Sequence, residues 1–172
     1  ILFGGRDSVG SPFEGDYLAD SWEWDGTGWT PQAGTPPPAR AYHEMAFDRA
    51  RGVTVLFGGY SRKSGVFGST LNFYEDTWEY DGDTWTERIS GGSTPGPRQH
   101  HAMAYDAERH RVVLHGGKDV DELDALWEWD GETWVAPEVV GAVPPVRRDH
   151  ASIYDTVRKR TVMWGGYTPG YC

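Results

Sequence analysis

Arginine and histidine recur in one short element, which holds the residues of this chain best suited to binding chemistry. The element reads Arg-x-x-His followed by a hydrophobic stretch ending in Asp, and it occupies 40–48, 98–106 and 147–155. Its arginines are Arg40, Arg98 and Arg147, and its histidines are His43, His101 and His150. Three imidazoles could bind zinc, and a collar of guanidinium groups could attract anions. Because the residues repeat in register, a packing role common to every repeat explains them better, so we predict no metal site. We expect the arginines to bond carbonyls or carboxylates of their own or a neighbouring repeat.

Carboxylates are concentrated in the segment from Lys118 to Asp124. The acidic residues are Asp119, Asp121, Glu122 and Asp124. Calcium binds oxygen ligands and would tolerate such a segment, but the spacing does not match an EF-hand loop and no glycine lies at the turn. We therefore predict a solvated acidic loop and no cofactor, with calcium as the alternative.

Two longer segments, 6–20 and 60–76, combine aromatic rings with polar groups. Rings stack on sugars or apolar side chains while polar groups fix orientation, which suits recognition of a protein or a glycan. Arg148 is a further candidate, because it follows a repeating arginine at a position that holds Ala41 and Gln99 in the other repeats. The predicted ligand-binding residues are Phe13, Tyr17, Tyr60, Arg62, Phe67, Tyr74 and Arg148. The alternative is that the rings fold back onto the edges of the strands.

Motifs for catalysis are missing from the sequence. It has no Gly-x-Ser-x-Gly elbow, no phosphate-binding glycine loop and no His-Glu-x-x-His. The one cysteine, Cys172, is the last residue. We therefore predict no catalytic residues and a non-catalytic protein.

Two further repeats identify the elements that must position these residues. Double glycines end short apolar runs, and a Trp-x-aromatic-Asp-Gly block is followed each time by one more tryptophan. The double glycines are Gly4-Gly5, Gly58-Gly59, Gly116-Gly117 and Gly165-Gly166; the tryptophans are Trp22, Trp78 and Trp127, then Trp29, Trp85 and Trp134. We expect these tryptophans to pack between repeats.

The repeats predict short antiparallel strands and no helix. Residues 42–47 alternate like a half-buried strand, 53–57 form an apolar run, and Asp25-Gly26 is a hairpin signal between alternating stretches. A period near 50 residues with four strands per unit indicates a repeat architecture. Counting along the chain predicts 3 + 4 + 4 + 2 = 13 strands.

The double glycine after an apolar strand, followed by the Trp-x-aromatic-Asp block and a tryptophan, resembles the kelch repeat over essentially the whole chain. It is closest to bacterial kelch-like proteins. The resemblance implies an all-β fold of four-stranded β-propeller blades, an architecture like that of WD repeats. The implied units are a partial blade at 1–35, blades at 36–93 and 94–143, and a partial blade at 144–172. One departure is His115, which takes the aromatic position of Phe3, Phe57 and Trp164.

The implied count of about three and a quarter blades is below the four expected of a closed ring. We expect the ring to be incomplete here, as part of a longer chain, or to be completed by oligomerisation, for example as a homodimer of half-rings.

The leading function is a binding module that acts through the face of the long loops, where a regular frame carries loops of variable length. Since some kelch-like propellers are enzymes, the resemblance leaves a sugar-modifying epimerase, lyase or hydrolase, with arginine and histidine in the channel, as the alternative. A structural half-propeller that assembles with itself is a third possibility.

Charge and hydropathy exclude two classes of partner. A net charge of -10 and a pI near 4.9 argue against nucleic acid, whose binding requires a basic face. The apolar runs are far shorter than the roughly 20 residues of a membrane helix, so we predict no membrane insertion. The resemblance to exported bacterial chains favours a secreted or cell-envelope location.

Overall fold

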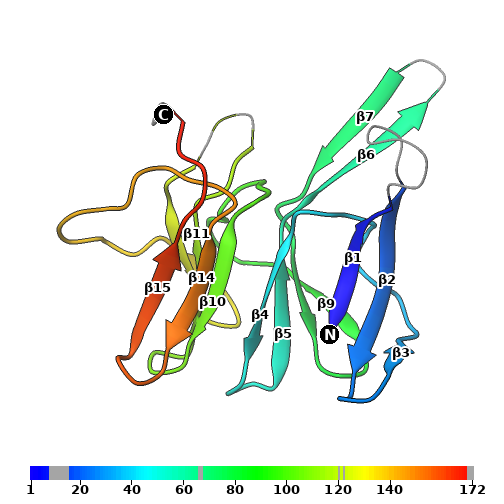
Figure 1. The fold of residues 1–172 in the computed structure, drawn as a ribbon, viewed down its shortest axis with the longest axis horizontal. Coiled ribbons are helices and arrows are strands. Elements are labelled where there is room, and N and C mark those ends of the chain that lie inside the picture. Colours follow the sequence, from blue (N-terminus) through cyan, green and yellow to red (C-terminus); the bar gives the residue numbers. More distant parts are fainter. Residues whose placement is uncertain (8–15, 66–67, 120, 122, 170–172) are drawn as a thin grey trace.

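Fifteen strands and no helix make up the part of the chain that the structure, a computed structural model, describes: residues 1–7, 16–65, 68–119, 121 and 123–169. Every strand pair is antiparallel (Figure 1). Sheet 1 contains β1 (Leu2–Arg6), β2 (Tyr17–Trp24) and β3 (Trp29–Pro31). Sheet 2 contains β4 (Glu44–Asp48), β5 (Val53–Phe57), β8 (Thr77–Tyr80) and β9 (Trp85–Arg88). Sheet 3 contains β10 (Ala102–Asp106), β11 (Arg111–His115), β12 (Leu126–Trp129) and β13 (Trp134–Val135), and sheet 4 contains β14 (Ala151–Asp155) and β15 (Arg160–Trp164).

These four sheets confirm the predicted all-β fold with antiparallel sheets of up to four strands. They also contain the 13 predicted strands. The first strands of sheets 2, 3 and 4 lie next to one another, with β10 between β4 and β14 (Figure 1). The tight turns lie at one end of the strands, and the long loops and the connections between sheets lie at the other end, here called the loop face.

The expectation of a loop over 60–76 is wrong for most of that segment. Residues Tyr60–Gly65 (β6) and Gly68–Phe73 (β7) pair in continuous register to form a separate hairpin that projects from the loop face (Figure 1). Most described side chains of β7 are exposed. Among its described side chains, burial in the hairpin is confined to its base, where Ser61 is buried, so the strands show no hydrophobic alternation and the sequence does not reveal them.

The double glycines allow neighbouring sheets to approach closely. The amide N–H groups of Gly5, Gly59 and Gly117 each donate a hydrogen bond to the carbonyl of the arginine that begins the next repeat, at 2.8–2.9 Å. The first glycine of each of these pairs has a positive φ, and a Cβ atom on Gly58 would lie 2.6 Å from the carbonyl oxygen of Arg98. A side chain there would collide with the backbone of the next sheet. Gly165 has the same type of φ, but nothing lies within 4 Å of its Cβ direction.

The main hydrophobic core lies between sheets 2 and 3. Its buried members are Ala46, Val55, Phe57, Met103, Val112, Leu114, Trp129 and Trp134. Trp134 packs against Phe57 at 5.1 Å between ring centroids and donates its indole N–H to Thr77 Oγ1 at 2.8 Å. Trp85 makes the matching contacts with sheet 1, to Phe3 and Ser21. Trp29, at the same repeat position in sheet 1, is half exposed.

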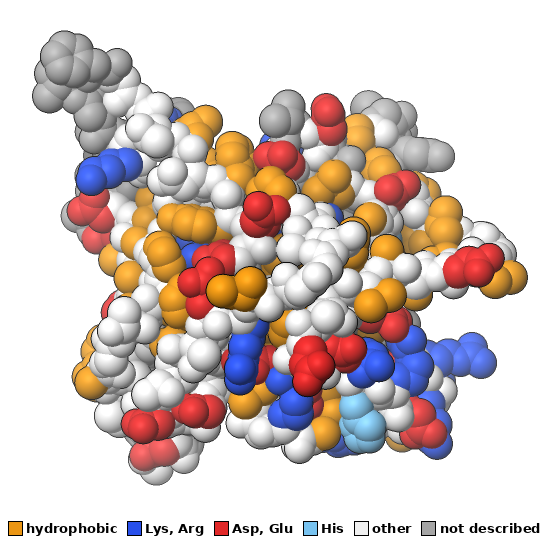
Figure 2. Space-filling model, turned by 180° about the vertical axis from the view of Figure 1, so that it is seen from behind, with side chains coloured by type: hydrophobic (Ala, Val, Ile, Leu, Met, Phe, Trp, Pro, Cys, Tyr) orange, Lys and Arg blue, Asp and Glu red, His pale blue; other side chains and the backbone are white. Residues whose placement is uncertain are grey.

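Lysine and arginine side chains gather at the tight-turn end of the molecule (Figure 2). Viewed from behind, most of the visible Lys and Arg side chains lie at the lower edge beside acidic ones, while hydrophobic side chains are spread over the middle and upper parts (Figure 2). Arg51 illustrates the pairing, because it bonds both Asp48 in its own turn and the buried Glu79 of β8. The described residues include no helix long and apolar enough to cross a membrane.

Candidate functional site

Three non-glycine residues with left-handed backbone occupy equivalent positions on the loop face. Tyr42, His100 and Asp149 have φ of 60°, 58° and 56°, and each directly precedes the repeating histidine. Such a conformation costs on the order of 1–3 kcal/mol per residue and is concentrated at functional sites. The His100 N–H donates to the carbonyl of Tyr42, and the Asp149 N–H donates to the carbonyl of His100, each at 3.0 Å. We call this chain of main-chain bonds across sheets 2, 3 and 4 the backbone belt.

The side chains on the backbone belt also contact one another. The rings of Tyr42 and His100 stack with centroids 4.4 Å apart and planes at 27°. His100 Nδ1 lies 2.5 Å from Asp149 Oδ1. The Tyr42 side chain is 40% exposed and that of Asp149 is 48% exposed, so both can reach a ligand.

Tyrosines from sheet 1 and the β6–β7 hairpin extend this row. The Tyr60 ring lies 5.6 Å from Tyr17, 5.2 Å from Phe73 and 6.4 Å from Tyr42. Burial, then Tyr60, raises the pKa of Tyr17 to about 12. The row therefore spans all four sheets, and we call it the mouth cluster. Its members are Tyr17, Tyr42, Tyr60, Phe73, His100 and Asp149.

The remaining predicted ligand-binding residues lie at several places. Arg148 stacks over Tyr167 at 4.7 Å and lies 3.7 Å from Asp149, at the end of the mouth cluster. Arg62 is exposed on the hairpin, where it donates to Ser69 Oγ. The ring of Tyr74 lies 3.8 Å from the Arg40 guanidinium, beneath the loop face. Phe13 and Phe67 lie outside the described residues.

The repeating arginines bond main-chain carbonyls across their own sheets. Nη1 of Arg40, Arg98 and Arg147 donates to the carbonyl of Gly58, Gly116 and Gly165 respectively, at 2.9–3.0 Å. Within the described part of the chain, Arg40 alone among them also pairs with a carboxylate, that of Asp76. These contacts hold the first strand of each repeat against the second.

The repeating histidines pack as neutral rings. His43 lies edge-on to Phe3 at 5.4 Å, His101 to Phe57 at 5.9 Å, and His150 to His115 at 5.4 Å. Burial, with help from Arg40, lowers the pKa of His43 to about 4, and burial likewise lowers the pKa of His150 to about 4. No group of three His, Cys, Asp or Glu side chains in the described ranges is placed to hold a metal ion.

Acid should weaken the fold through these rings, and His43→Phe tests this. Below the ordinary pKa of 6.5 the unfolded chain binds a proton at His43, whereas the folded chain does so only near pH 4. The free energy of unfolding therefore falls as pH drops through this window, by up to about 1.4 kcal/mol per pH unit for each histidine. His43→Phe keeps a ring against Phe3 but removes this proton, so we expect a shallower decline in urea unfolding between about pH 6.5 and pH 4.

Glu44 provides the reason for comparing the variant with the parent chain. Burial raises the pKa of Glu44 to about 7, so protonated Glu44 favours the folded chain. This contribution to the free energy of unfolding is lost as pH rises toward 7, which is the opposite of the trend that His43 produces. Glu44 is present in both proteins and cancels in the difference. Parallel pH profiles for the two proteins would contradict a buried neutral His43.

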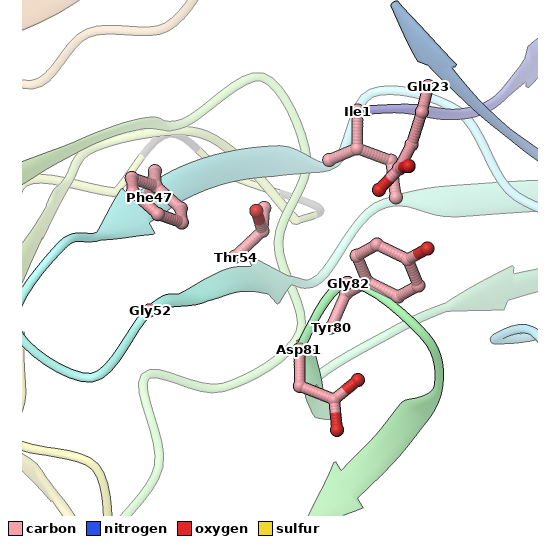
Figure 3. Close-up of a pocket in the computed structure, with 8 residues that line it drawn as sticks. All are labelled: Ile1, Glu23, Phe47, Gly52, Thr54, Tyr80, Asp81 and Gly82. Carbon is pink, nitrogen blue, oxygen red and sulfur yellow. The ribbon is translucent and has the colours of Figure 1, made fainter. Parts of the chain in front are cut away.

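A separate hollow of about 250 Å³ lies at the tight-turn end, where sheets 1 and 2 meet. Ile1, Glu23 and Tyr80 line one side, and Phe47 and Thr54 line the other (Figure 3). Burial, then Glu23, raises the pKa of Tyr80 to about 12. None of the predicted ligand-binding residues that the structure describes lines this hollow.

Sequence reasoning missed Tyr42, His100 and Asp149. The sequence singles out Ala41, Gln99 and Arg148 as the variable position of the Arg-x-x-His element, yet Ala41 and Gln99 are buried, and all three form bridges with the residue that follows a double glycine. The next position varies just as much, from Tyr to His to Asp. Its backbone conformation cannot be read from the sequence, because none of the three residues is glycine.

Comparison with known proteins agrees with this fold. Residues 1–166 match the family model described as the KLHDC2/KLHL20/DRC7 Kelch-repeats domain. A solved structure described as "Structure of YjhT" is similar with a TM-score of 0.62 and 14% identity, over 90% of this chain and 47% of that one. The chain thus spans about half the length of that protein, and at this identity the likeness is one of fold. No curated protein matches the chain.

Proposed function

Because the chain belongs to the kelch-repeat family, we propose that it is a non-catalytic binding module that recognises a protein or a carbohydrate through the mouth cluster. One observation carries the proposal: equivalent, strained backbone positions on three sheets present three different side chains to the same surface. Positions that serve packing repeat their residue type, as the arginines and histidines do, whereas these positions do not.

The chemistry of the mouth cluster suits a ligand with both an apolar face and hydroxyl or amide groups. The exposed ring of Tyr42 offers a stacking surface. Asp149 offers acceptor oxygens, and the neighbouring Arg148 offers donors. A regular frame that carries loops of variable length on one face is also where binding residues normally lie.

Replacement of Tyr42 tests the proposal. Ligands would first be found by screening the purified chain against a glycan array and a displayed peptide library. Tyr42→Asn removes the ring while keeping a residue that tolerates the left-handed backbone. We expect at least about a tenfold loss of affinity for each hit, since a buried aromatic anchor at an interface contributes 2 kcal/mol or more.

Trp24→Ala is the matched control, because Trp24 is an exposed aromatic residue on β2 at the tight-turn end. It should leave affinity unchanged. Equal losses in the two variants, or hits that neither variant affects, would place binding elsewhere than in the mouth cluster.

The pair formed by His100 and Asp149 favours one alternative, a sugar-modifying enzyme. A carboxylate that accepts from one ring nitrogen orients an imidazole to exchange a proton through the other. A turnover screen with sialic acids and uronates distinguishes the two functions. Turnover by the parent chain that is abolished in His100→Ala would show that the protein is a sugar-modifying enzyme and not a non-catalytic binding module.

A further inference from the structure

Sheets 1 and 2 place a carboxylate beside the first tryptophan of the repeat. The Asp76 carboxylate accepts from Arg40 Nη1 and Nη2 at 2.5 and 2.7 Å and from the Trp78 indole N–H at 2.7 Å. In sheet 1 the equivalent Asp20 accepts from the Trp22 indole at 2.6 Å. The residue two positions before this tryptophan therefore binds its indole, and in sheet 2 it also neutralises a buried arginine.

Sheet 3 departs from this pattern at one residue, Ala125. The indole nitrogen of Trp127 is buried without a hydrogen-bond partner among the described residues. Arg98 is 1% exposed and donates to three main-chain carbonyls, those of Pro95, Gly96 and Gly116. An arginine has five N–H groups, so two remain without an acceptor among the described residues.

Among the described residues, the buried charge of Arg98 thus lacks a carboxylate partner like the one that Arg40 has in Asp76. Burial lowers the pKa of Arg98 to about 10, and no described carboxylate opposes the shift. A buried donor or charge that stays unpaired is costly, and a guanidinium pairs best with a planar anion that takes two parallel bonds. Sheet 3 has Ala125 where sheet 2 has Asp76, so it lacks one carboxyl group, which is about the size of formate.

We propose that a small planar monovalent anion of the carboxylate type binds between Arg98 and the indole nitrogen of Trp127, in the place that the Asp76 carboxylate takes in sheet 2. The guanidinium and the indole N–H of sheet 2 are present again in sheet 3 as Arg98 and Trp127. Arg98 Nη2 already donates to the Pro95 carbonyl and offers the anion its second N–H, and the acceptor is supplied from solution. The bound anion connects β12 to the segment that leads into β10, two residues before His100 of the mouth cluster.

The acidic character of the chain does not prevent this. The described carboxylate next to Ala125, Asp124, is exposed, so solvent and salt screen its charge, and the Debye length at physiological ionic strength is about 8 Å. A buried guanidinium in direct contact with the anion is screened much less, so its attraction prevails over the screened repulsion.

Thermal unfolding in sodium formate tests the site, with ionic strength held constant by sodium gluconate, whose anion is bulkier. Binding to the folded state raises the melting temperature, by about 5–10 °C when formate reaches about 100 times its Kd. Ala125→Asp supplies the carboxylate within the chain, so its melting temperature should be higher and independent of formate. The Trp127 indole N–H resonance, assigned with Trp127→Phe, should shift with formate at the same Kd.

Asp76→Ala is the matched control, because it creates the same set of donors in sheet 2. It should lower the melting temperature, and formate should restore part of the loss. The proposal would be overturned if formate raises the melting temperature of Asp76→Ala but leaves the melting temperature of the parent chain and the Trp127 indole resonance unchanged. An equal response to chloride would overturn the assignment to a planar carboxylate.

Discussion

Gly58→Ala should lower the free energy of unfolding by about 3–5 kcal/mol, which is the combined cost of a left-handed alanine and a backbone collision. Gly58 has a φ of +67°, and its added Cβ would lie 2.6 Å from the Arg98 carbonyl oxygen and 3.2 Å from the His101 ring. The Arg98 carbonyl cannot retreat easily, because it accepts the hydrogen bond from the Gly59 N–H at 2.8 Å. Urea unfolding followed by tryptophan fluorescence measures the loss.

Gly52→Ala separates the two costs. Gly52 has nearly the same φ, +71°, but no atom lies within 4 Å of its Cβ direction. We expect Gly52→Ala to lower the free energy of unfolding by only about 1–2 kcal/mol, which is the cost of placing alanine in a left-handed conformation. If Gly52→Ala and Gly58→Ala destabilise the chain equally, contact between sheets 2 and 3 is not what requires glycine at position 58.

Trp134→Ala should cost about 3–5 kcal/mol as well, since truncation of a buried tryptophan leaves a cavity in addition to the lost apolar burial. Trp134 is 2% exposed, belongs to the core between sheets 2 and 3, and packs against Phe57 and Trp129. Its loss also leaves Thr77 Oγ1 without the indole donor. The midpoint of urea unfolding should fall accordingly.

Trp29→Ala is the internal control for this change, because Trp29 has the same repeat position in sheet 1 but is 52% exposed. It should cost about 1 kcal/mol or less, as exposed substitutions do. A loss at Trp29 as large as that at Trp134 would show that contact between sheets does not explain the tryptophan repeat.

The strand framework could be predicted because its causes are local and repeated. Asp-Gly turns, double glycines and alternating apolar residues each recur several times, so an error in one copy is corrected by the others. The β6–β7 hairpin appears once and its described side chains are buried only at its base, so it has no such signal. Its contacts with the rest of the chain depend on rings such as Tyr60, which sequence alone could assign equally to a loop or a strand edge.

The mouth cluster was predictable only in part. Tyr17 and Tyr60 could be named because aromatic residues in variable segments are conspicuous. Tyr42, His100 and Asp149 come together because main-chain bonds between sheets align three segments about 50 residues apart. Such alignment is set by packing distances between sheets, which the order of residues along the chain does not specify.

The backbone belt has a consequence for how this surface can diversify. Its bonds join main-chain N–H and C=O groups, so they persist whichever side chains stand at positions 42, 100 and 149. Mutations at these sites can therefore change the chemistry of the surface without breaking the contacts that hold the sheets together. Tyrosine, histidine and aspartate already occupy these equivalent positions within one chain, with the same main-chain bonds joining the three sheets.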